Sequence, residues 1–376
     1  MLPPGRFVAT YRVAAAADVI EARADAIALE QSVELPRAAV HDARVHEAVI
    51  GRVQAIRPVD DGYFDVDIAL AEETVGRDPG QLMNMLFGNT SLQADVTLMD
   101  MTCDAAFAAT FGGPRFGIAG LRARTAQGRP LCCAALKPQG LPPERLAALA
   151  RTLAEAGLDV IKDDHGLADQ SAAPFERRVA MCQRAVDDVA HASGHRALYA
   201  PSLSGSLDDM RRQLDIARRH GVALALVAPM VCGVANFAAL MRDAGVPLLA
   251  HPALGGAGHI APELLLGRLF RLFGADATIF PHAGGRFAFT MAECVGIADR
   301  ARLPWHDLPA TMPVPAGGMS VERVAHLREL YGDEAMFLVG GSLLLAGEGL
   351  LERARTFVRA VTMPVSHDAR SSERVI

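Results

Sequence analysis

The sequence predicts a (β/α)8 TIM barrel preceded by a small N-terminal α+β domain of the ferredoxin-like type. From about residue 130 onward, eight short apolar runs alternate with amphipathic stretches, whereas the preceding part mixes strands and helices. Eight strand-helix units favour a closed barrel over an open doubly wound sheet, and no GxGxxG follows an early strand. We therefore assign residues 1–120 to the N-terminal domain and 121–376 to the barrel.

The eight predicted barrel strands are apolar throughout, as expected for a parallel sheet that is buried on both faces. Amphipathic helical patterns separate them, and several of these end at a glycine. The strands are LCCAAL, DVI, ALYA, ALALVA, PLLA, ATIF, MPVP and MFLV, at residues 131–136, 159–161, 197–200, 223–228, 247–250, 277–280, 312–315 and 336–339.

In the N-terminal domain, polar and apolar residues alternate as in half-buried strands at residues 7–13 and 63–70. Residues 17–33 and 78–88 have helical periodicity instead. This mixture predicts an α+β domain.

Composition favours a globular protein that works on small molecules. Hydrophobic residues make up 51% and charged residues 21%, and the net charge of -6 offers no basic field for nucleic acid or an anionic membrane. No apolar run is long enough to span a membrane and no secretion signal begins the chain, which predicts a cytoplasmic protein. The six cysteines lack CxxC spacing, so we expect buried thiols and neither disulfides nor a zinc site.

Polar residues and glycine pairs follow several predicted strands, where a barrel of this kind carries its catalytic groups. The glycine pairs after the last two strands expose backbone N–H groups at the usual phosphate-binding position. These residues are Lys137, Lys162, Asp164, His165, His251, His282, Gly317, Gly318, Gly340 and Gly341.

Each of these residues also has an ordinary structural interpretation. A single lysine after a strand is usually solvated, a histidine is often a hydrogen-bonded core residue, and paired glycines are commonly turns. Their joint placement on one face of the barrel is what favours a site that binds a phosphorylated ligand.

The chain resembles the RuBisCO superfamily large subunit along its length, and especially the RuBisCO-like proteins (form IV), which do not carboxylate. The motifs are LEQSVELP, FGNTSL, GPRFGIAGLR, ALKPQGL, GLDVIKDDHG, LLAHPALGG, FPHAGGRF, PVPAGGM and FLVGG, in that order. The resemblance implies a homodimer, or an assembly of dimers, in which Glu30 and Asn89 enter the partner's active site. It also implies that CO2 carbamylates Lys162, which holds Mg2+ together with Asp164.

The resemblance further makes Lys137 an acid/base group near an enolate, and we expect His251 and His282 to be further acid/base candidates. A metal bound to the carbonyl and hydroxyl oxygens stabilises an enolate as a Lewis acid. A lysine kept neutral by burial, or a carbamate oxygen, can act as a base near pH 7.

Three departures from the carboxylases narrow the function. His165 replaces the third acidic ligand, which suits Mn2+, Fe2+ or Zn2+ better than Mg2+. The loop after the sixth barrel strand has Arg286 and no lysine, so carboxylation is not expected. Pro252 and Ala316 replace polar residues of the second phosphate pocket, which predicts a monophosphate with an apolar or small far end.

The resemblance leaves several reactions open. The favoured one isomerises 5-methylthioribulose 1-phosphate to 1-methylthioxylulose 5-phosphate in sulfur and methionine salvage. The alternatives are decarboxylation or hydrolysis of a branched 3-oxo sugar-acid phosphate of the oxo-isoapionate type, with Arg286 facing the carboxylate, and enolisation of a diketo-methylthiopentyl phosphate. A catalytically inactive binding protein and a Schiff-base aldolase are two further hypotheses.

Overall fold

The computed structural model describes residues 2–60, 62–125 and 128–363. Near the N-terminus, four antiparallel strands form one sheet in the order β2-β3-β1-β4. With helices α1 (Ile20–Glu30) and α2 (Pro79–Phe87) the chain order is βαββαβ, which confirms the ferredoxin-like prediction. The strands are β1 (Arg6–Ala14), β2 (Arg52–Asp60), β3 (Tyr63–Ala71) and β4 (Val96–Thr102).

Strands β2 and β4 were not among the strands that we expected from the sequence. β2 is an edge strand whose residues are exposed or half-buried, so no regular apolar face marks it. It also contains Pro58, a residue that an edge strand tolerates.

Eight parallel strands follow, and they close into the predicted barrel. They form the runs β12-β5-β6-β7 and β11-β10-β9-β8. A parallel bridge between Ser202 and Leu226 joins the two runs on one side, and β11 lies beside β12 on the other. The strands are β5 (Leu131–Leu136), β6 (Val160–Asp163), β7 (Leu198–Ala200), β8 (Ala225–Val227), β9 (Leu248–Ala250), β10 (Ala277–Pro281), β11 (Met312–Ala316) and β12 (Met336–Val339).

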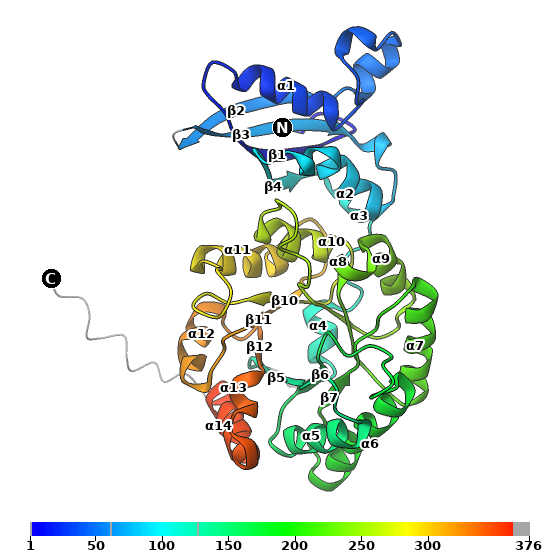
Figure 1. The fold of residues 1–376 in the computed structure, drawn as a ribbon, viewed down its shortest axis with the longest axis vertical. Coiled ribbons are helices and arrows are strands. Elements are labelled where there is room, and N and C mark those ends of the chain that lie inside the picture. The colour runs from blue at the N-terminus through cyan, green and yellow to red at the C-terminus, as the bar shows by residue number, and fades with distance from the viewer. Residues whose placement is uncertain (1, 61, 126–127, 364–376) are drawn as a thin grey trace, which may run out of the picture.

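Helices surround this barrel, as Figure 1 shows. Short helices α3 (Ala105–Ala109) and α4 (Gly117–Arg122) connect the two sheets, and α4 packs Ile118 and Leu121 into the barrel interior. The division proposed at residue 120 falls inside α4 and stays a prediction. The outer helices are α5 (Pro143–Glu155), α6 (Phe175–Ser193), α7 (Leu207–Arg219), α8 (Pro229–Cys232), α9 (Val234–Asp243), α10 (Phe270–Leu272), α11 (Met291–Arg302), α12 (Val324–Tyr331), α13 (Gly341–Leu344) and α14 (Leu350–Thr362).

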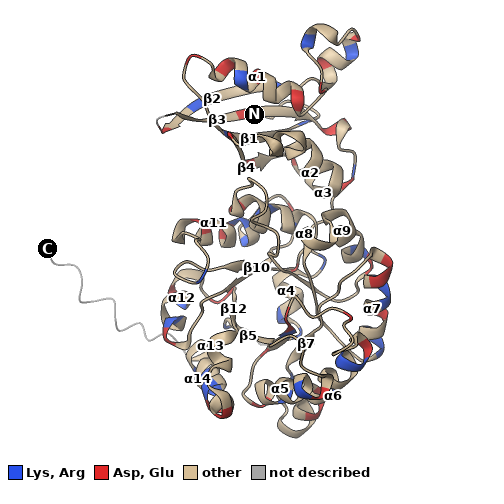
Figure 2. Cartoon of the chain, viewed as in Figure 1, with Lys and Arg blue, Asp and Glu red and all other residues tan. Residues whose placement is uncertain are grey.

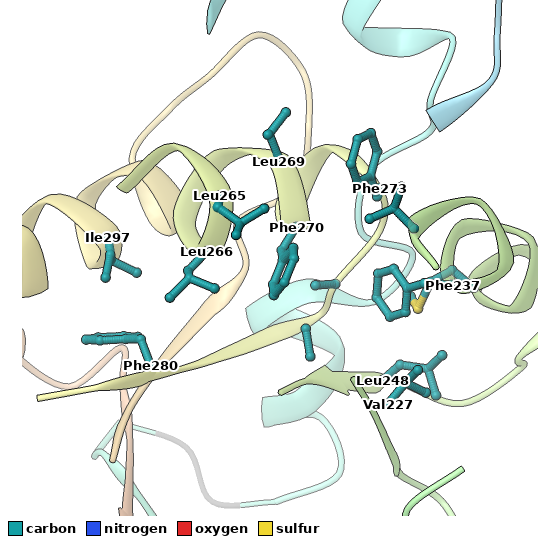
Figure 3. Packing of buried hydrophobic residues seen from close by; sticks show 14 of the residues in the cluster. Val227, Phe237, Leu248, Leu265, Leu266, Leu269, Phe270, Phe273, Phe280 and Ile297 are labelled. Carbon is teal, nitrogen blue, oxygen red and sulfur yellow. The ribbon is translucent and has the colours of Figure 1, made fainter. Parts of the chain in front are cut away.

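The hydrophobic core has two parts. One fills the barrel interior, where Val160 and Leu226 point inward. The other lies between strands and helices, where the π-helical segment η5 (Glu263–Leu269) and α10 pack leucine and phenylalanine side chains on the sheet (Figure 3). Charged residues gather instead on outer helices such as α7 (Figure 2). Within the described part of the chain, no helix is both long and apolar enough to cross a membrane.

The N-terminal sheet is attached to a barrel loop. The N–H of Leu98 on β4 donates to the His259 carbonyl, and the N–H of Ala261 donates back to Leu98. Beside this bridge, the carboxylate of Asp100 accepts hydrogen bonds from Arg268 and Arg300, at 3.0 and 2.6 Å. The loop that follows β9 is therefore fixed to the N-terminal sheet of the same chain.

Candidate active site

A cavity of about 660 Å³ opens at the carboxyl ends of the barrel strands. Nearly all of the polar residues and glycines that the sequence singled out line it together. They are Lys137, Lys162, Asp164, His165, His251, Arg286, Gly317, Gly318, Gly340 and Gly341.

Strands β5 and β6 place the two lysines of the chain side by side. Lys137 follows β5 directly, and Lys162 lies within β6, paired in register with Ala135 of β5. The Lys162 side chain is almost completely buried, and its ammonium donates to the Asp163 carbonyl at 2.9 Å. Burial lowers the pKa of Lys162 to about 8, so part of this amine is neutral near physiological pH.

Asp164 is the centre of the polar contacts in the cavity. One of its carboxylate oxygens accepts a hydrogen bond from the Lys137 ammonium, and the other lies 3.0 Å from Nδ1 of His165. The N–H of Gly166 donates to that second oxygen as well. Burial and the nearby Arg286 lower the pKa of Lys137, whereas its contact with Asp164 favours the charged ammonium.

His165 and His251 meet face to face on the cavity wall. Their ring centroids are 4.0 Å apart and the ring planes differ by 10°. The Ala253 N–H donates to Nδ1 of His251 at 3.1 Å, so the proton of the neutral ring is on Nε2. Burial, followed by the positive charge of Lys162, lowers the pKa of His251 to about 2, and the same causes lower the pKa of His165.

Asp163 does not face the cavity, although it lies between two residues that do. Its carboxylate is fully buried and accepts hydrogen bonds from Arg178, Tyr199 and the N–H of Ser202, at 3.0, 2.8 and 3.1 Å. Successive residues of a strand point to opposite faces, which explains why Lys162 and Asp164 turn inward while Asp163 turns outward. Asp163 therefore anchors the end of β6 to α6.

The two glycine pairs present free backbone amides to the cavity. The N–H groups of Gly317, Gly318, Gly340 and Gly341 donate no hydrogen bond to any described residue. Gly317 and Gly318 have φ angles of +73° and +81°, which glycine adopts readily. A Cβ on Gly318 would lie 2.4 Å from Cα of Gly285, because the loop after β10 packs directly on this pair. Unpaired amides in such turns can bind an anion.

Three expected site residues lie elsewhere in the single chain. His282 is fully buried, and its ring lies edge-on against Tyr331 with the centroids 5.7 Å apart. It is not among the cavity-lining residues, and its Nε2 has no hydrogen-bond partner in the described part of the chain. Glu30 and Asn89 are joined by a 3.0 Å hydrogen bond on the N-terminal domain and also do not line the cavity.

The cavity also has an apolar wall, which includes large side chains that the sequence patterns did not single out. Among its members, Leu254 and Phe287 are 58% and 46% exposed, although both are large apolar residues. The Arg286 guanidinium lies over the Phe287 ring, 4.9 Å from its centroid. These residues are in loops after β9 and β10, where no periodic pattern indicates the direction of a side chain.

The described residues contain no group of three His, Cys, Asp or Glu side chains that could hold a metal ion. The described residues that line the cavity include three cations, Lys137, Lys162 and Arg286, and one carboxylate, Asp164. This excess of positive charge suits an anion and opposes a bare divalent cation. A metal site would need an additional negative group, and carbamylation of Lys162 would supply it.

Fold and site together define a (β/α)8-barrel protein with a cavity at the barrel mouth that has more cations than carboxylates, and with a ferredoxin-like domain before the barrel. The chain belongs to the RuBisCO family, and within this family to the RuBisCO-like proteins. The family described as "Ribulose bisphosphate carboxylase large chain, catalytic domain" matches residues 117–277.

Two relatives are similar over almost the whole chain. Ribulose bisphosphate carboxylase-like protein 1 of Rhodopseudomonas palustris is 54% identical and covers 95% of this chain and 97% of its own. The 5-methylthioribulose-1-phosphate isomerase of Rhodospirillum rubrum is 50% identical, with coverage of 95% and 96%. The crystal structure of a RuBisCO-like protein from Rhodopseudomonas palustris superposes with a TM-score of 0.90 at 49% identity and covers 96% of this chain and 98% of its own.

A more distant relative is named for a different reaction. The 2,3-diketo-5-methylthiopentyl-1-phosphate enolase of Geobacillus thermodenitrificans is 30% identical and covers 94% of this chain and 91% of its own. The barrel and N-terminal domain thus agree with solved RuBisCO-like proteins, while the names of the relatives include more than one reaction.

Proposed function

We propose that this RuBisCO-like protein is an isomerase that converts 5-methylthioribulose 1-phosphate to 1-methylthioxylulose 5-phosphate without fixing CO2. One observation carries the proposal: both lysines of the chain, Lys137 and Lys162, lie at neighbouring strand ends in one cavity. Every other strongly basic residue is arginine, which stays protonated in proteins. Lysine at these two positions supports a need for an amine that can lose its proton, either to act as a base or to react with CO2.

The reaction consists of two similar proton shifts along the carbon chain. In the first, a base removes the proton from C3 and the carbonyl oxygen on C2 becomes protonated, which gives an enediol. A proton then returns to C2 while the C3 hydroxyl loses its own, and the carbonyl has moved to C3. The second shift repeats this exchange between C3 and C4, so the isomerisation needs no oxidant or reductant.

The cavity residues can share these proton movements. Lys137 would deliver and remove the proton at carbon, because it lines the cavity and its ammonium donates a hydrogen bond to Asp164, which can take up and return a proton. His251 is a neutral ring with its proton on Nε2, so it can donate a hydrogen bond to a developing enolate oxygen. His282 would act from behind the loop after β10 and not by direct contact, since it does not line the cavity.

We propose that Lys162 is carbamylated and that the carbamate, Asp164 and His165 hold one divalent metal ion, Mg2+ or another. These residues fit a divalent metal ion only after carbamylation of Lys162, because carbamylation replaces a cation by an anion beside Asp164. The neutral fraction of the Lys162 amine, with its pKa of about 8, is the form that attacks CO2. When bound, the metal would act as a Lewis acid on the substrate's carbonyl and hydroxyl oxygens.

The substrate phosphate would bind the amides of Gly317, Gly318, Gly340 and Gly341. Lys137 is a cation beside one of these glycines, because its Cε lies 3.9 Å from the position of a Cβ on Gly340. The cavity also has an apolar wall, which suits a methylthio group better than a second phosphate. The loop after β10 brings Arg286 and no lysine to the cavity, which argues against carboxylation.

A second candidate function has one observation in its favour. Arg286 lines the cavity and could face a carboxylate, as a decarboxylase or hydrolase of a branched 3-oxo sugar-acid phosphate would require. The relationship to 2,3-diketo-5-methylthiopentyl-1-phosphate enolases keeps that enolisation as another alternative. Both alternatives use a monophosphate. The sugar acid differs from the favoured substrate in its carboxylate, whereas the diketo compound also carries a 5-methylthio group and differs in having a second carbonyl.

We also propose that a homodimer completes the site. Glu30 and Asn89 do not reach the cavity of their own chain, which supports their entry into the cavity of a partner. Six unpaired cysteines fit a reducing compartment, so we place the protein in the cytoplasm.

Direct turnover is the main test. We expect the purified protein with Mg2+, bicarbonate and 5-methylthioribulose 1-phosphate in D2O to form the xylulose product, with deuterium at the carbons beside the moving carbonyl. Lys137→Met and Lys162→Met should each reduce the rate at least a hundredfold, and the surface variant Arg151→Met should not. Absence of exchange in the wild type would support a binding protein, and trapping by borohydride would support an aldolase.

Because the chain has two lysines, carbamylation can be tested at a single residue. With 13C-bicarbonate, we expect one carbamate signal by NMR that survives in Lys137→Met and disappears in Lys162→Met. Mg2+ binding, measured by calorimetry, should require bicarbonate in the wild type. Mg2+ binding of equal strength without bicarbonate would contradict the carbamate proposal.

A further inference from the structure

A strained turn carries one leucine into the cavity. The N–H of Gly255 donates to the Pro252 carbonyl at 2.8 Å, which closes a tight turn after β9. Leu254 occupies its third position with a φ of +62°, a region that favours glycine or asparagine. Two glycines follow directly, at positions 255 and 256. Glycine at 254 would remove the strain, so the leucine side chain itself has a role at this position.

The leucine lies across the cavity from Lys137. In the ring of eight strands, β9 stands opposite β5, the strand that leads to Lys137, and the glycine pairs follow β11 and β12. Leu254 lines the cavity and is 58% exposed. Gly340 lies beside Lys137, since a Cβ on it would be 3.9 Å from Cε of the lysine. A ligand that binds these two residues with its phosphate and carbonyl would extend its other end across the cavity, to the side on which Leu254 lies.

The same turn orients a candidate catalytic group. Its Ala253 N–H donates to Nδ1 of His251, which keeps the Nε2 proton available for a substrate oxygen. A ligand that packs on Leu254 would stabilise the turn in the conformation that orients His251. Binding energy at the far end of the substrate can in this way favour the reaction at its centre.

We propose that Leu254 determines specificity by contacting the apolar group at the end of the substrate distant from the phosphate. This inference rests on the proposed function and extends it to one residue. It implies that the enzyme discriminates between a methylthio group and a hydroxyl at this end, and that the preference is expressed in kcat as well as KM.

The test compares 5-methylthioribulose 1-phosphate with ribulose 1-phosphate, which has a hydroxyl in place of the methylthio group. In Leu254→Asn and Leu254→Gly, the kcat/KM ratio of the two substrates should fall at least tenfold. Both replacements accept a positive φ, so they keep or relieve the backbone geometry. Leu345→Asn is the matched control, because Leu345 is 88% exposed and does not line the cavity.

A structural role and a substrate-binding role predict different results. If Leu254 only shaped the turn, Asn or Gly would serve as well and the ratio would not change, which would overturn the inference. An unchanged ratio together with loss of the dimer on gel filtration would also overturn it, since Leu254 would then be a subunit contact. Thermal unfolding checks that both variants are folded.

Failure of the proposed reaction would be recognised separately. If the wild type turned over neither sugar, the proposed function would be wrong. The role of Leu254 in binding would then be tested by comparing the dissociation constants of both compounds in the wild type and the variants. A preference of the wild type for the methylthio compound that both variants lose would still support the inference. Equal preference in wild type and variants would reject it.

Discussion

The imidazole rings of His165 and His251 stack 4.0 Å apart on the cavity wall. His251 is enclosed by this ring and by a turn, and Lys162 adds positive charge nearby, so its pKa is lowered to about 2. We predict that His251 stays neutral from pH 8 to pH 5. A 15N NMR titration should show one protonated and one unprotonated ring nitrogen throughout this range.

The neutral state of His251 also predicts how the free energy of unfolding changes with pH. Below pH 6.5 the unfolded chain protonates His251, whereas the folded chain does not, so this residue makes the free energy of unfolding decrease as the pH falls toward 5. His251→Gln should reduce that slope, and replacement of the exposed His41 should not. An equal slope in wild type and His251→Gln would contradict the prediction.

The buried Lys162 amine should destabilise the fold at neutral pH. Its pKa decreases from an ordinary 10.5 to about 8, which corresponds to roughly 3 kcal/mol of unfavourable free energy. The cost is present below pH 8, decreases as the pH rises and disappears above 10.5. We therefore predict that Lys162→Met raises the free energy of unfolding at pH 7 by up to about 3 kcal/mol, measured with urea in bicarbonate-free buffer.

Two further measurements check this explanation. The difference between wild type and Lys162→Met should shrink when urea unfolding is repeated at pH 9 and pH 10. Lys137→Met, at a less buried position beside Asp164, should not show the same pH dependence. Destabilisation by Lys162→Met at every pH would mean that the lysine's contacts outweigh its burial.

The loop after β10 depends on glycine at position 318. A Cβ there would lie 2.4 Å from Cα of Gly285, whereas one at Gly194, which has a similar positive φ of +77°, would meet open space. We predict that Gly318→Ala lowers the free energy of unfolding by about 2 kcal/mol more than Gly194→Ala does. It should also weaken sugar phosphate binding at least tenfold by calorimetry, and equal effects of the two variants would contradict the close packing.

The barrel could be predicted from the sequence because its strands are apolar on both faces. The predicted ranges of β5 and β12 agree with the structure, and the other six barrel strands agree within two residues at each end. β2 was not predicted, because this exposed edge strand contains Pro58 and has no apolar face. The ferredoxin-like type of the domain was predicted, whereas two of its four strands were found only in the structure.

The site was predictable for most residues that follow a strand directly, as Lys137 does, but not for His282, which follows β10 and does not line the cavity. The site was less predictable where the direction of a side chain determines whether the residue faces the cavity. Asp163 and Asp164 look equivalent in the sequence, but strand alternation turns one toward Arg178 and the other toward the cavity. His282 and Leu254 lie in loops, where backbone angles and packing set the direction and no periodic pattern records it.

The buried ion pair between Asp163 and Arg178 should be essential for the fold although it does not touch the cavity. Both side chains are fully buried, and Arg178 also donates to the carbonyls of Ala168 and Ala173, in the segment that follows β6. Removal of one partner leaves an uncompensated buried charge. We predict that Arg178→Met lowers the free energy of unfolding by about 3–5 kcal/mol, measured by urea denaturation.

The control for this prediction is an ion pair on the outer helices. Arg151 pairs with Asp188, and the two side chains are 44% and 48% exposed, so solvent screens their attraction. Arg151→Met should change the free energy of unfolding by less than about 1 kcal/mol. Because the Asp163–Arg178 pair fixes the end of β6, Arg178→Met should also diminish the Lys162 carbamate signal, and a folded variant with wild-type stability and carbamylation would show that neighbouring contacts hold β6 without it.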